Sequence, residues 1–228
     1  MTGQYSDSSG PLLAIDSASP TASYAIGHGS RVLAVTSAPS GPSSPGALRL
    51  IHEVLERAGC DLRDLAGAIA VRGPGSFTGL RIGLSTLLGL HRSTGLPCTS
   101  ITTFDALAWQ ARDRPRPIVA AVDALRSEWF TQTFGPGRAP APREAPRLRT
   151  AVDLAELGDV AMVGFEVERL TEAVPSAERI AADPLAVSVL ELAEATEPSW
   201  EPATLTEPLY LRPPAATPPR RRAPTARA

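Results

Sequence analysis

The feature that most constrains this chain is a glycine-rich stretch between two apolar segments. Residues 72–83 read Arg-Gly-Pro-Gly-Ser-Phe-Thr-Gly-Leu-Arg-Ile-Gly. They follow the short apolar run Ala68–Val71 and lead into a long apolar pattern that closes at Gly95. A strand, a glycine loop and a helix in this order are typical of sites at which backbone amides meet phosphate groups.

The stretch does not match the two best-known phosphate-binding templates. No Gly-x-x-x-x-Gly-Lys-Ser/Thr pattern passes through it, and Thr78 stands where a dinucleotide-binding loop has its third glycine. All 22 basic residues of the chain are arginines. The absence of lysine excludes a lysine phosphate clamp and a lysine Schiff base, so the loop needs another role.

Composition is that of an ordinary soluble globular protein. The 228 residues are 43% hydrophobic and 20% charged, and the net charge of −2 gives no general reason to bind nucleic acid or a membrane surface. The two cysteines, Cys60 and Cys98, form no framework and are interpreted as reduced thiols. Neither a secretory signal nor a membrane-spanning run is evident, so we expect a cytoplasmic protein.

Residues 11–111 are expected to form a first subdomain, a βββαβαβα unit with a mixed sheet. Apolar alternation predicts strands, and apolar residues at helical spacing predict helices. Ser44 is expected to cap the first helix, with Pro45 as its first residue. The predicted strands are Leu12–Ser17, Ala22–Gly27, Arg31–Ser37, Ala68–Arg72 and Cys98–Ile101, and the predicted helices are Ala47–Ala58, a helix starting near Ser76 or Thr78, and Thr103–Ala111.

Residues 112–212 predict a second subdomain that is a smaller, degenerate copy of the first. A Pro/Arg-rich stretch over residues 135–149 is interpreted as a long loop. Residues 1–10 and the Pro/Arg-rich tail 213–228 are expected to be disordered. The predicted elements are strands Ile118–Asp123, Glu128–Phe134 and Val160–Gly164, and helices near Ala151–Leu157 and Pro184–Glu194.

Four segments between residues 11 and 212 carry a resemblance to a known family. The opening Leu13–Ser19 resembles the first strand of the actin/Hsp70/sugar-kinase (ASKHA) superfamily. The glycine stretch resembles the signature of the bacterial TsaB (YeaZ) family, and its specificity is high. Asp123–Trp129 resembles that family's Asp-x-Arg-x-x-Glu strand pair, with Arg126 displaced by one residue, and Pro208–Arg212 matches its closing Pro-x-Tyr-Leu-Arg.

The resemblance implies an α/β fold of the two-subdomain actin-like type and a role in tRNA modification. Members of this family take part in forming N6-threonylcarbamoyladenosine at position 37 of tRNAs that read codons starting with A. They resemble and pair with the catalytic paralogue TsaD, work alongside the ATPase TsaE, and form homodimers when alone. The resemblance therefore implies that this chain is a non-catalytic subunit, which contacts tRNA only through the complex and has no cofactor of its own. Whether nucleotide binds at the interface with the partner stays open.

The residues agree with a chain that is not the catalyst. The paralogue's metal site uses two histidines four residues apart on a helix, whereas His28, His52 and His91 form no pair with ligand spacing. Asp16 and Ser17 are interpreted as a vestigial nucleotide loop, with Asp16 capping a strand turn. The second phosphate loop would be residues 163–166, where Phe165 and Glu166 replace the small residues that a phosphate requires.

Two interpretations of the signature loop stay open. In the first, the loop is only a strand-to-helix turn, with Ser76 or Thr78 as helix cap and Phe77 anchored in the core. In the second, arginines and free amides of the loop face a partner or a nucleotide. The loop residues are Arg72, Gly73, Pro74, Gly75, Ser76, Phe77, Thr78, Gly79 and Arg81.

The helix after the loop is apolar on more than one face, as is the helix Ala47–Ala58. A helix of this kind needs cover on more than one side, and small residues at four-residue spacing (Gly79, Gly83, Ser85, Gly89) allow another helix to approach closely. The resemblance implies that these two helices pair with the partner; the alternative is that the leucines form internal core. The predicted contacts are Leu48, Ile51, Leu55, Leu80, Gly83, Leu84, Leu87 and Leu88.

Two other functions compete with the partner role. A peptidase- or kinase-like enzyme of the same superfamily would lack the metal ligands and the second phosphate loop. Direct tRNA binding through the arginines of residues 213–228 conflicts with the near-neutral charge of the rest of the chain, because nucleic-acid affinity comes largely from neutralised phosphates.

Overall fold

Two five-stranded mixed sheets with the same strand order organise the structure. The computed structural model describes residues 10–41, 43–172 and 174–212, so residues 1–9 and 213–228, for which disorder is predicted, lie outside the described residues. The first sheet has the order β3-β2-β1-β4-β5 and the second the order β8-β7-β6-β9-β10. In each, the central strand pairs antiparallel with one neighbour and parallel with the other. The second half therefore repeats the topology of the first.

The inner strands of both sheets are mostly buried, whereas β3, β8 and β10 at the edges are exposed or only partly buried. β1 and β4 are buried along their whole length, as expected for strands covered on both faces. The first sheet consists of β1 (Leu12–Asp16), β2 (Thr21–His28), β3 (Arg31–Pro39), β4 (Gly67–Val71) and β5 (Cys98–Ile101). The second consists of β6 (Ile118–Asp123), β7 (Glu128–Phe134), β8 (Arg147–Thr150), β9 (Ala161–Gly164) and β10 (Glu178–Ala181).

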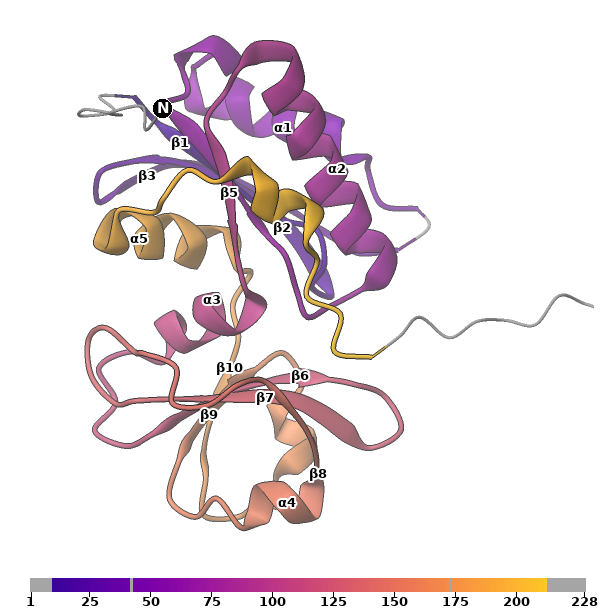
Figure 1. The fold of residues 1–228 in the computed structure, drawn as a ribbon, viewed down its shortest axis with the longest axis vertical. Coiled ribbons are helices and arrows are strands. Elements are labelled where there is room, and N and C mark those ends of the chain that lie inside the picture. Colours follow the sequence, from indigo (N-terminus) through magenta and orange to yellow (C-terminus); the bar gives the residue numbers. More distant parts are fainter. Residues whose placement is uncertain (1–9, 42, 173, 213–228) are drawn as a thin grey trace, which may run out of the picture.

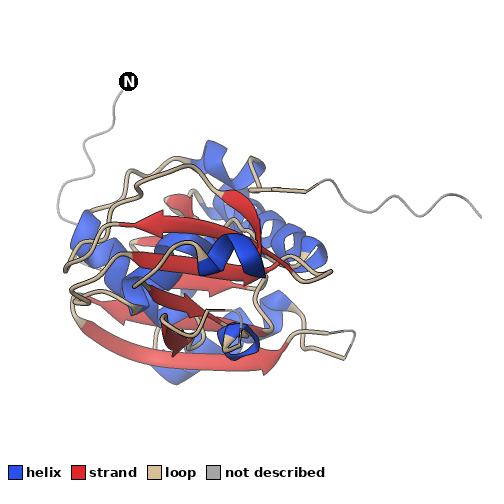
Figure 2. Ribbon diagram, turned by 90° about the horizontal axis from the view of Figure 1, so that it is seen from below, coloured by secondary structure: helices blue, strands red, loops and turns tan. Residues whose placement is uncertain are grey.

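Helices form three layers around the two sheets (Figures 1 and 2). α1 (Ala47–Ala58) and α2 (Phe77–Thr94) cover the outer face of the first sheet. α4 (Ala151–Ala155) and a 3-10 turn at Val167–Leu170 cover the outer face of the second. α3 (Thr103–Gln110) and α5 (Ala186–Thr196) lie between the sheets, and two further 3-10 turns occur at Leu62–Asp64 and Pro202–Thr206. No helix in the described ranges is long and apolar enough to cross a membrane.

The two middle helices each pack on the sheet of the other half. α3 contacts β6 and β9, whereas α5 contacts β1 and β2. The Ala186 N–H donates to Ser23 Oγ (3.1 Å), and the Gln110 side-chain amide donates to Ser188 Oγ (2.9 Å). The predicted boundary after residue 111 thus separates the strands of the two sheets, although α5, which follows it, lies on the first sheet.

The start of α1 differs from the prediction. Gly46 is the N-cap residue, and no side chain caps this helix, so Ser44 is not its cap and Pro45 lies before its first turn. The end agrees with the prediction: Gly59 is left-handed, its N–H donates to the Glu56 carbonyl (3.1 Å), and the Cys60 N–H donates to the Leu55 carbonyl (3.2 Å). This pattern satisfies carbonyls that the last helical turn leaves free.

Two edge strands were not predicted. β8 lies inside and just beyond the stretch interpreted as a long loop, and β10 lies where no element was expected. Both are four residues long, and β8 is largely exposed, so neither has the apolar alternation that marks a strand. Pairing with β7 and β9, rather than local pattern, produces them.

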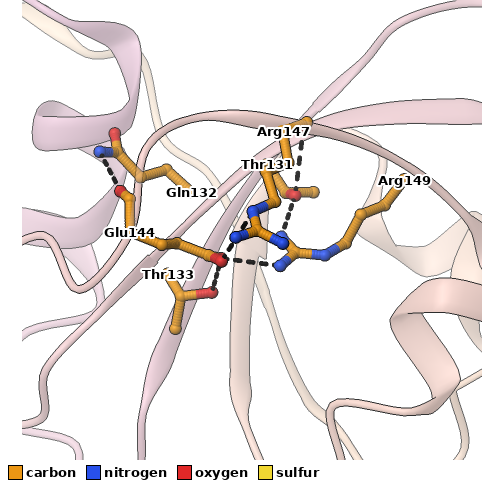
Figure 3. Close-up of polar contacts among 6 residues, drawn as sticks. All are labelled: Thr131, Gln132, Thr133, Glu144, Arg147 and Arg149. Atoms are coloured by element: carbon orange, nitrogen blue, oxygen red, sulfur yellow. Dashed lines mark hydrogen bonds and ion pairs between the residues drawn. The ribbon is translucent and has the colours of Figure 1, made fainter.

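A polar cluster joins β7, β8 and the loop between them (Figure 3). The Glu144 carboxylate accepts hydrogen bonds from Thr133 Oγ1 (2.6 Å) and from the guanidinium of Arg149 (2.7 Å), and it pairs with Arg147 (3.2 Å). Arg149, with only 10% of its side chain exposed, also donates to Thr131 Oγ1 (2.6 Å). Burial favours the protonated form of Glu144, but these hydrogen bonds and charges outweigh it and lower its pKa.

We expect Glu144→Gln to lower the free energy of unfolding by about 2 kcal/mol at pH 7, because Arg149 loses a charged partner in a partly buried site. A depressed folded-state pKa stabilises the fold above the unfolded-state pKa, near 4.5, and this contribution is lost as the pH falls through the lower folded-state value. Urea unfolding of both proteins across this range should show the difference shrinking. Glu56→Gln, in an exposed pair with His52, should change stability little at any pH in this range.

Candidate partner surface and signature loop

Hydrogen bonds tie the signature loop to two neighbouring segments. The Ser76 N–H donates to the Ala18 carbonyl (2.8 Å), and the Thr103 N–H donates to the Gly73 carbonyl (2.8 Å). Thr103 Oγ1, which is buried, donates to the Pro74 carbonyl (2.6 Å). Gly73 has φ +109°, and a Cβ there would lie 3.0 Å from the Leu209 carbonyl oxygen, so this position requires glycine. The loop is held by the β1–β2 turn and by α3.

Ser76 directly precedes α2 and is its N-cap residue. Its Oγ accepts a hydrogen bond from the Gly79 N–H (3.3 Å), so Ser76 rather than Thr78 has the predicted capping role. Phe77 is only half-buried and is not the core anchor that the first interpretation of the loop expected. Its ring lies 5.0 Å from that of Tyr210, and the Arg81 guanidinium lies 3.9 Å from its centroid. The aromatic ring therefore belongs to a surface stack that includes the end of the described chain.

The small residues of α2 divide between two faces. A Cβ on Gly79 would lie 2.0 Å from the Ser17 carbonyl oxygen, and a Cβ on Gly83 would lie 2.3 Å from Ser17 Oγ. These two glycines let α2 approach the β1–β2 turn, not another helix, which corrects the prediction. A Cβ on Gly89 would meet no atom of the described residues within 4 Å, and Ser85 is exposed. Ser85 and Gly89 therefore lie on the outer face of α2.

The eight predicted partner contacts fall into a buried group and a small exposed group. Six are buried inside the chain: Ile51, Leu55, Leu80, Gly83, Leu84 and Leu87. They correspond to the alternative of internal core, because such side chains have no free surface on which a partner could dock. Leu88 is partly buried against the core, whereas Leu48 is 63% exposed.

A further apolar residue of the outer face was missed. Ile82 on α2 is 45% exposed, and Thr78, Arg81 and Ser85 around it are exposed as well. The signal was present in the sequence: Ile82 lies one turn from each of Thr78 and Ser85, a polar row that marks the solvent side of this helix. α1 and α2 pack against each other and form one helical layer (Figure 1). Leu48 and Ile82 are exposed residues of this layer.

Asp16 lies at the end of β1 and is fully buried. Its Oδ1 accepts hydrogen bonds from the Ala18 N–H (2.9 Å) and the Ser19 N–H (3.2 Å), so it caps the turn between β1 and β2, as expected. Burial raises its pKa, against the lowering effect of these hydrogen bonds. Ser17 Oγ donates to the Gly79 carbonyl (2.8 Å) and is engaged in packing α2.

A cleft of about 380 Å³ separates the two halves beside the signature loop. The first half contributes the β1–β2 turn with Ser19 and the loop with Ser76; the second contributes Asp123, Phe165 and Glu166. Glu166 and Asp123 are both paired with Arg169 (2.6 and 2.8 Å). The two segments compared with phosphate loops thus face one cleft, and its second wall presents an aromatic ring and carboxylates.

The three histidines occupy unrelated positions. His28 is exposed at the end of β2, His52 lies 3.4 Å from Glu56 on the exposed side of α1, and His91 Nδ1 lies 2.8 Å from the Leu96 carbonyl oxygen. Within the described residues, no three histidine, cysteine or acidic side chains come together as metal ligands would.

Known proteins of threonylcarbamoyladenosine synthesis are similar to about half of this chain. The family model for TsaD, tRNA N6-adenosine threonylcarbamoyltransferase, matches residues 44–138. The tRNA threonylcarbamoyladenosine biosynthesis protein TsaB of Escherichia coli (strain K12) is 32% identical over 122 residues, 52% of this chain and 52% of that protein. An uncharacterised protein of Mycobacterium tuberculosis is 28% identical over 214 residues, 91% of this chain and 94% of that one. The chain spans about half the length of the curated TsaB relatives it first matches.

A solved structure extends the likeness to almost the whole described chain. YeaZ from Pseudomonas aeruginosa superimposes with a TM-score of 0.73 at 24% identity, covering 89% of this chain and 100% of that one. At this identity the match bears on the fold. It confirms the predicted two-subdomain α/β fold of the actin-like ASKHA type.

Proposed function

We propose that this chain, as a member of the TsaB (YeaZ) family, is a non-catalytic partner of a TsaD-type threonylcarbamoyltransferase. In this role it activates formation of N6-threonylcarbamoyladenosine at position 37 of tRNAs that read codons starting with A. A TsaE-type ATPase completes the system, and tRNA is met through the complex. The proposed location is the cytoplasm, and the proposed state of the chain without its partner is a homodimer.

The observation that carries this proposal is the outer surface of α1 and α2. Leu48 and Ile82 are large apolar side chains exposed on two neighbouring helices, and Gly89 and Ser85 leave the α2 backbone open to close approach. Apolar contact with small residues around it suits a helix–helix interface. The same part of the chain is the part that the TsaD family model matches.

Asp16 and the second wall of the cleft support a role without nucleotide hydrolysis. Asp16 is buried, its pKa is raised, and its Oδ1 is occupied by the turn that it caps. A carboxyl group in this state is a poor ligand for a hydrated Mg²⁺ ion, which prefers exposed, ionised oxygens. Across the cleft, Glu166 and Asp123 share the single guanidinium of Arg169, so this wall keeps a net negative charge that disfavours phosphates. We therefore propose no cofactor held by this chain alone.

Deletion of the gene for this chain tests the proposal. The expected result is loss of threonylcarbamoyladenosine from bulk tRNA, measured by mass spectrometry of its nucleosides, with recovery when the wild-type gene is returned. Returning Asp16→Asn should also restore the modification, because a structural cap needs no ionised carboxylate. Unchanged modification after deletion would reject the proposed function. Loss of rescue by Asp16→Asn, with the variant folded, would favour an enzyme instead.

A further inference from the structure

The segment Glu207–Arg212 contacts both halves of the chain. On the first half it meets the signature loop. The Leu209 N–H donates to the Arg72 carbonyl (2.7 Å), and the Arg72 guanidinium donates to the Glu207 carbonyl (3.2 Å). Tyr210 stacks on Phe77, and Arg81 Nε donates to the Tyr210 hydroxyl (3.4 Å). The backbone of the segment is thus hydrogen-bonded to Arg72 of the loop, and the Tyr210 ring contacts Phe77 and Arg81 at the start of α2.

The last described residue of the segment reaches the second half. The Arg212 guanidinium donates to the Ala124 carbonyl (2.9 Å) and forms an ion pair with Glu128, and it lies 5.8 Å from the centroid of the Phe130 ring. All three partners belong to the β6–β7 hairpin. One guanidinium thus holds a backbone group and a carboxylate at once, with donors whose directions are fixed by its planar fork, whereas those of an ammonium rotate freely.

The hairpin that Arg212 holds is strained. Leu125, Arg126 and Ser127 are consecutive and all left-handed, with φ of 64°, 58° and 60°. Non-glycine residues in this region cost roughly 1–2 kcal/mol each. Such a turn persists only where its surroundings impose it. The Asp123 carboxylate, which accepts from the Leu125 N–H (2.8 Å), and Arg212 supply that support.

The attachment points of the segment lie close in sequence to residues that line the cleft between the halves. Gly75 and Ser76, just after Arg72, line the cleft from the first half, and Asp123, next to Ala124, lines it from the second. Each attachment point of the segment is therefore only a few residues away in sequence from one wall of the cleft. Leu209 and Leu211 also pack against the core between the sheets, which anchors the segment along its length.

We infer that Glu207–Arg212 is a strap that couples the signature loop to the β6–β7 hairpin. If the segment is released from the hairpin, the signature loop becomes less protected, and if it is released from the loop, the hairpin becomes less protected. The two sites are coupled in this way although they belong to different halves. The strap is a property of the isolated chain. Its test therefore needs no partner, and its failure would leave the proposed function standing.

Amide hydrogen exchange in the Arg212→Ala variant of the full chain tests the strap. We expect exchange about tenfold faster at Ala124 and Glu128, as loss of one charge-assisted hydrogen bond lowers the cost of local opening. The deciding amides are Ser76 and Leu209, on the far attachment, whose exchange should accelerate as well. By reciprocity, Tyr210→Ala should accelerate exchange at Ala124 and Glu128.

Arg114→Ala is the matched control. Arg114 pairs with Glu178 at an exposure close to that of Arg212 and Glu128, but outside both attachment sites. It should leave Ser76 and Leu209 unchanged. Should Arg212→Ala fail to fold, Arg212→Lys keeps the charge without the fork and is expected to accelerate the same amides to a smaller extent. Faster exchange confined to the hairpin in the folded variants, with the signature loop unchanged, would overturn the strap.

Discussion

Gly79→Ala is expected to lower the free energy of unfolding by about 3 kcal/mol and the melting temperature by roughly 10 °C. The added methyl group would lie 2.0 Å from the Ser17 carbonyl oxygen, which is backbone and cannot swing away. Either α2 moves off the β1–β2 turn or the turn shifts. Both would disturb the hydrogen bond from Ser17 Oγ to the Gly79 carbonyl. Urea and thermal unfolding followed by circular dichroism measure the loss.

Gly89→Ala is the control on the same helix and should have the opposite sign. No atom of the described residues lies within 4 Å of a Cβ at this position, so only the helix-forming preference of alanine acts. A gain of about 0.5–1 kcal/mol is expected. A loss at Gly89 similar to that at Gly79 would mean that both glycines serve the helix in the same way. The contact with Ser17 would then not be the reason for glycine.

Much of the fold could be predicted because its signals are local. The strands at Cys98–Ile101, Ile118–Asp123 and Glu128–Phe134 have the predicted bounds, since short apolar runs between turn residues mark them clearly. β8 and β10 could not be predicted in the same way. Their residues carry no alternating pattern, and they become strands only by pairing with an edge that the rest of the sheet provides.

The candidate site was harder to predict because its decisive contacts join residues far apart in sequence. A helix with leucines on every side must be covered on several faces, but the sequence does not show which residues cover each face. The face with Gly79 and Gly83 is covered by Ser17, more than sixty residues earlier. The stack of Phe77 with Tyr210 likewise joins two segments that were noted separately. Their meeting depends on the return of the chain to the first sheet after α5.

The same distinction between covered and open faces determines how the partner surface must be tested. Leu84→Arg, the obvious substitution from sequence, would bury a charge in the core, because Leu84 is 3% exposed. We expect it to destabilise the chain by more than about 4 kcal/mol and to prevent folding. Loss of a complex in that variant would therefore report unfolding and not an interface.

Ile82→Arg, two residues earlier, should separate the two effects. Its side chain is 45% exposed and lies outside the core, so stability should change by no more than about 0.5 kcal/mol. Affinity for a TsaD-type protein, measured by isothermal titration calorimetry, should fall about 100-fold, since a charge is placed in an apolar contact. Val152→Arg on α4, also strongly exposed but on the opposite outer layer, should change neither quantity. Equal affinity for all three proteins would place the partner away from α2, and a loss shared by Val152→Arg would point to charge rather than to this surface.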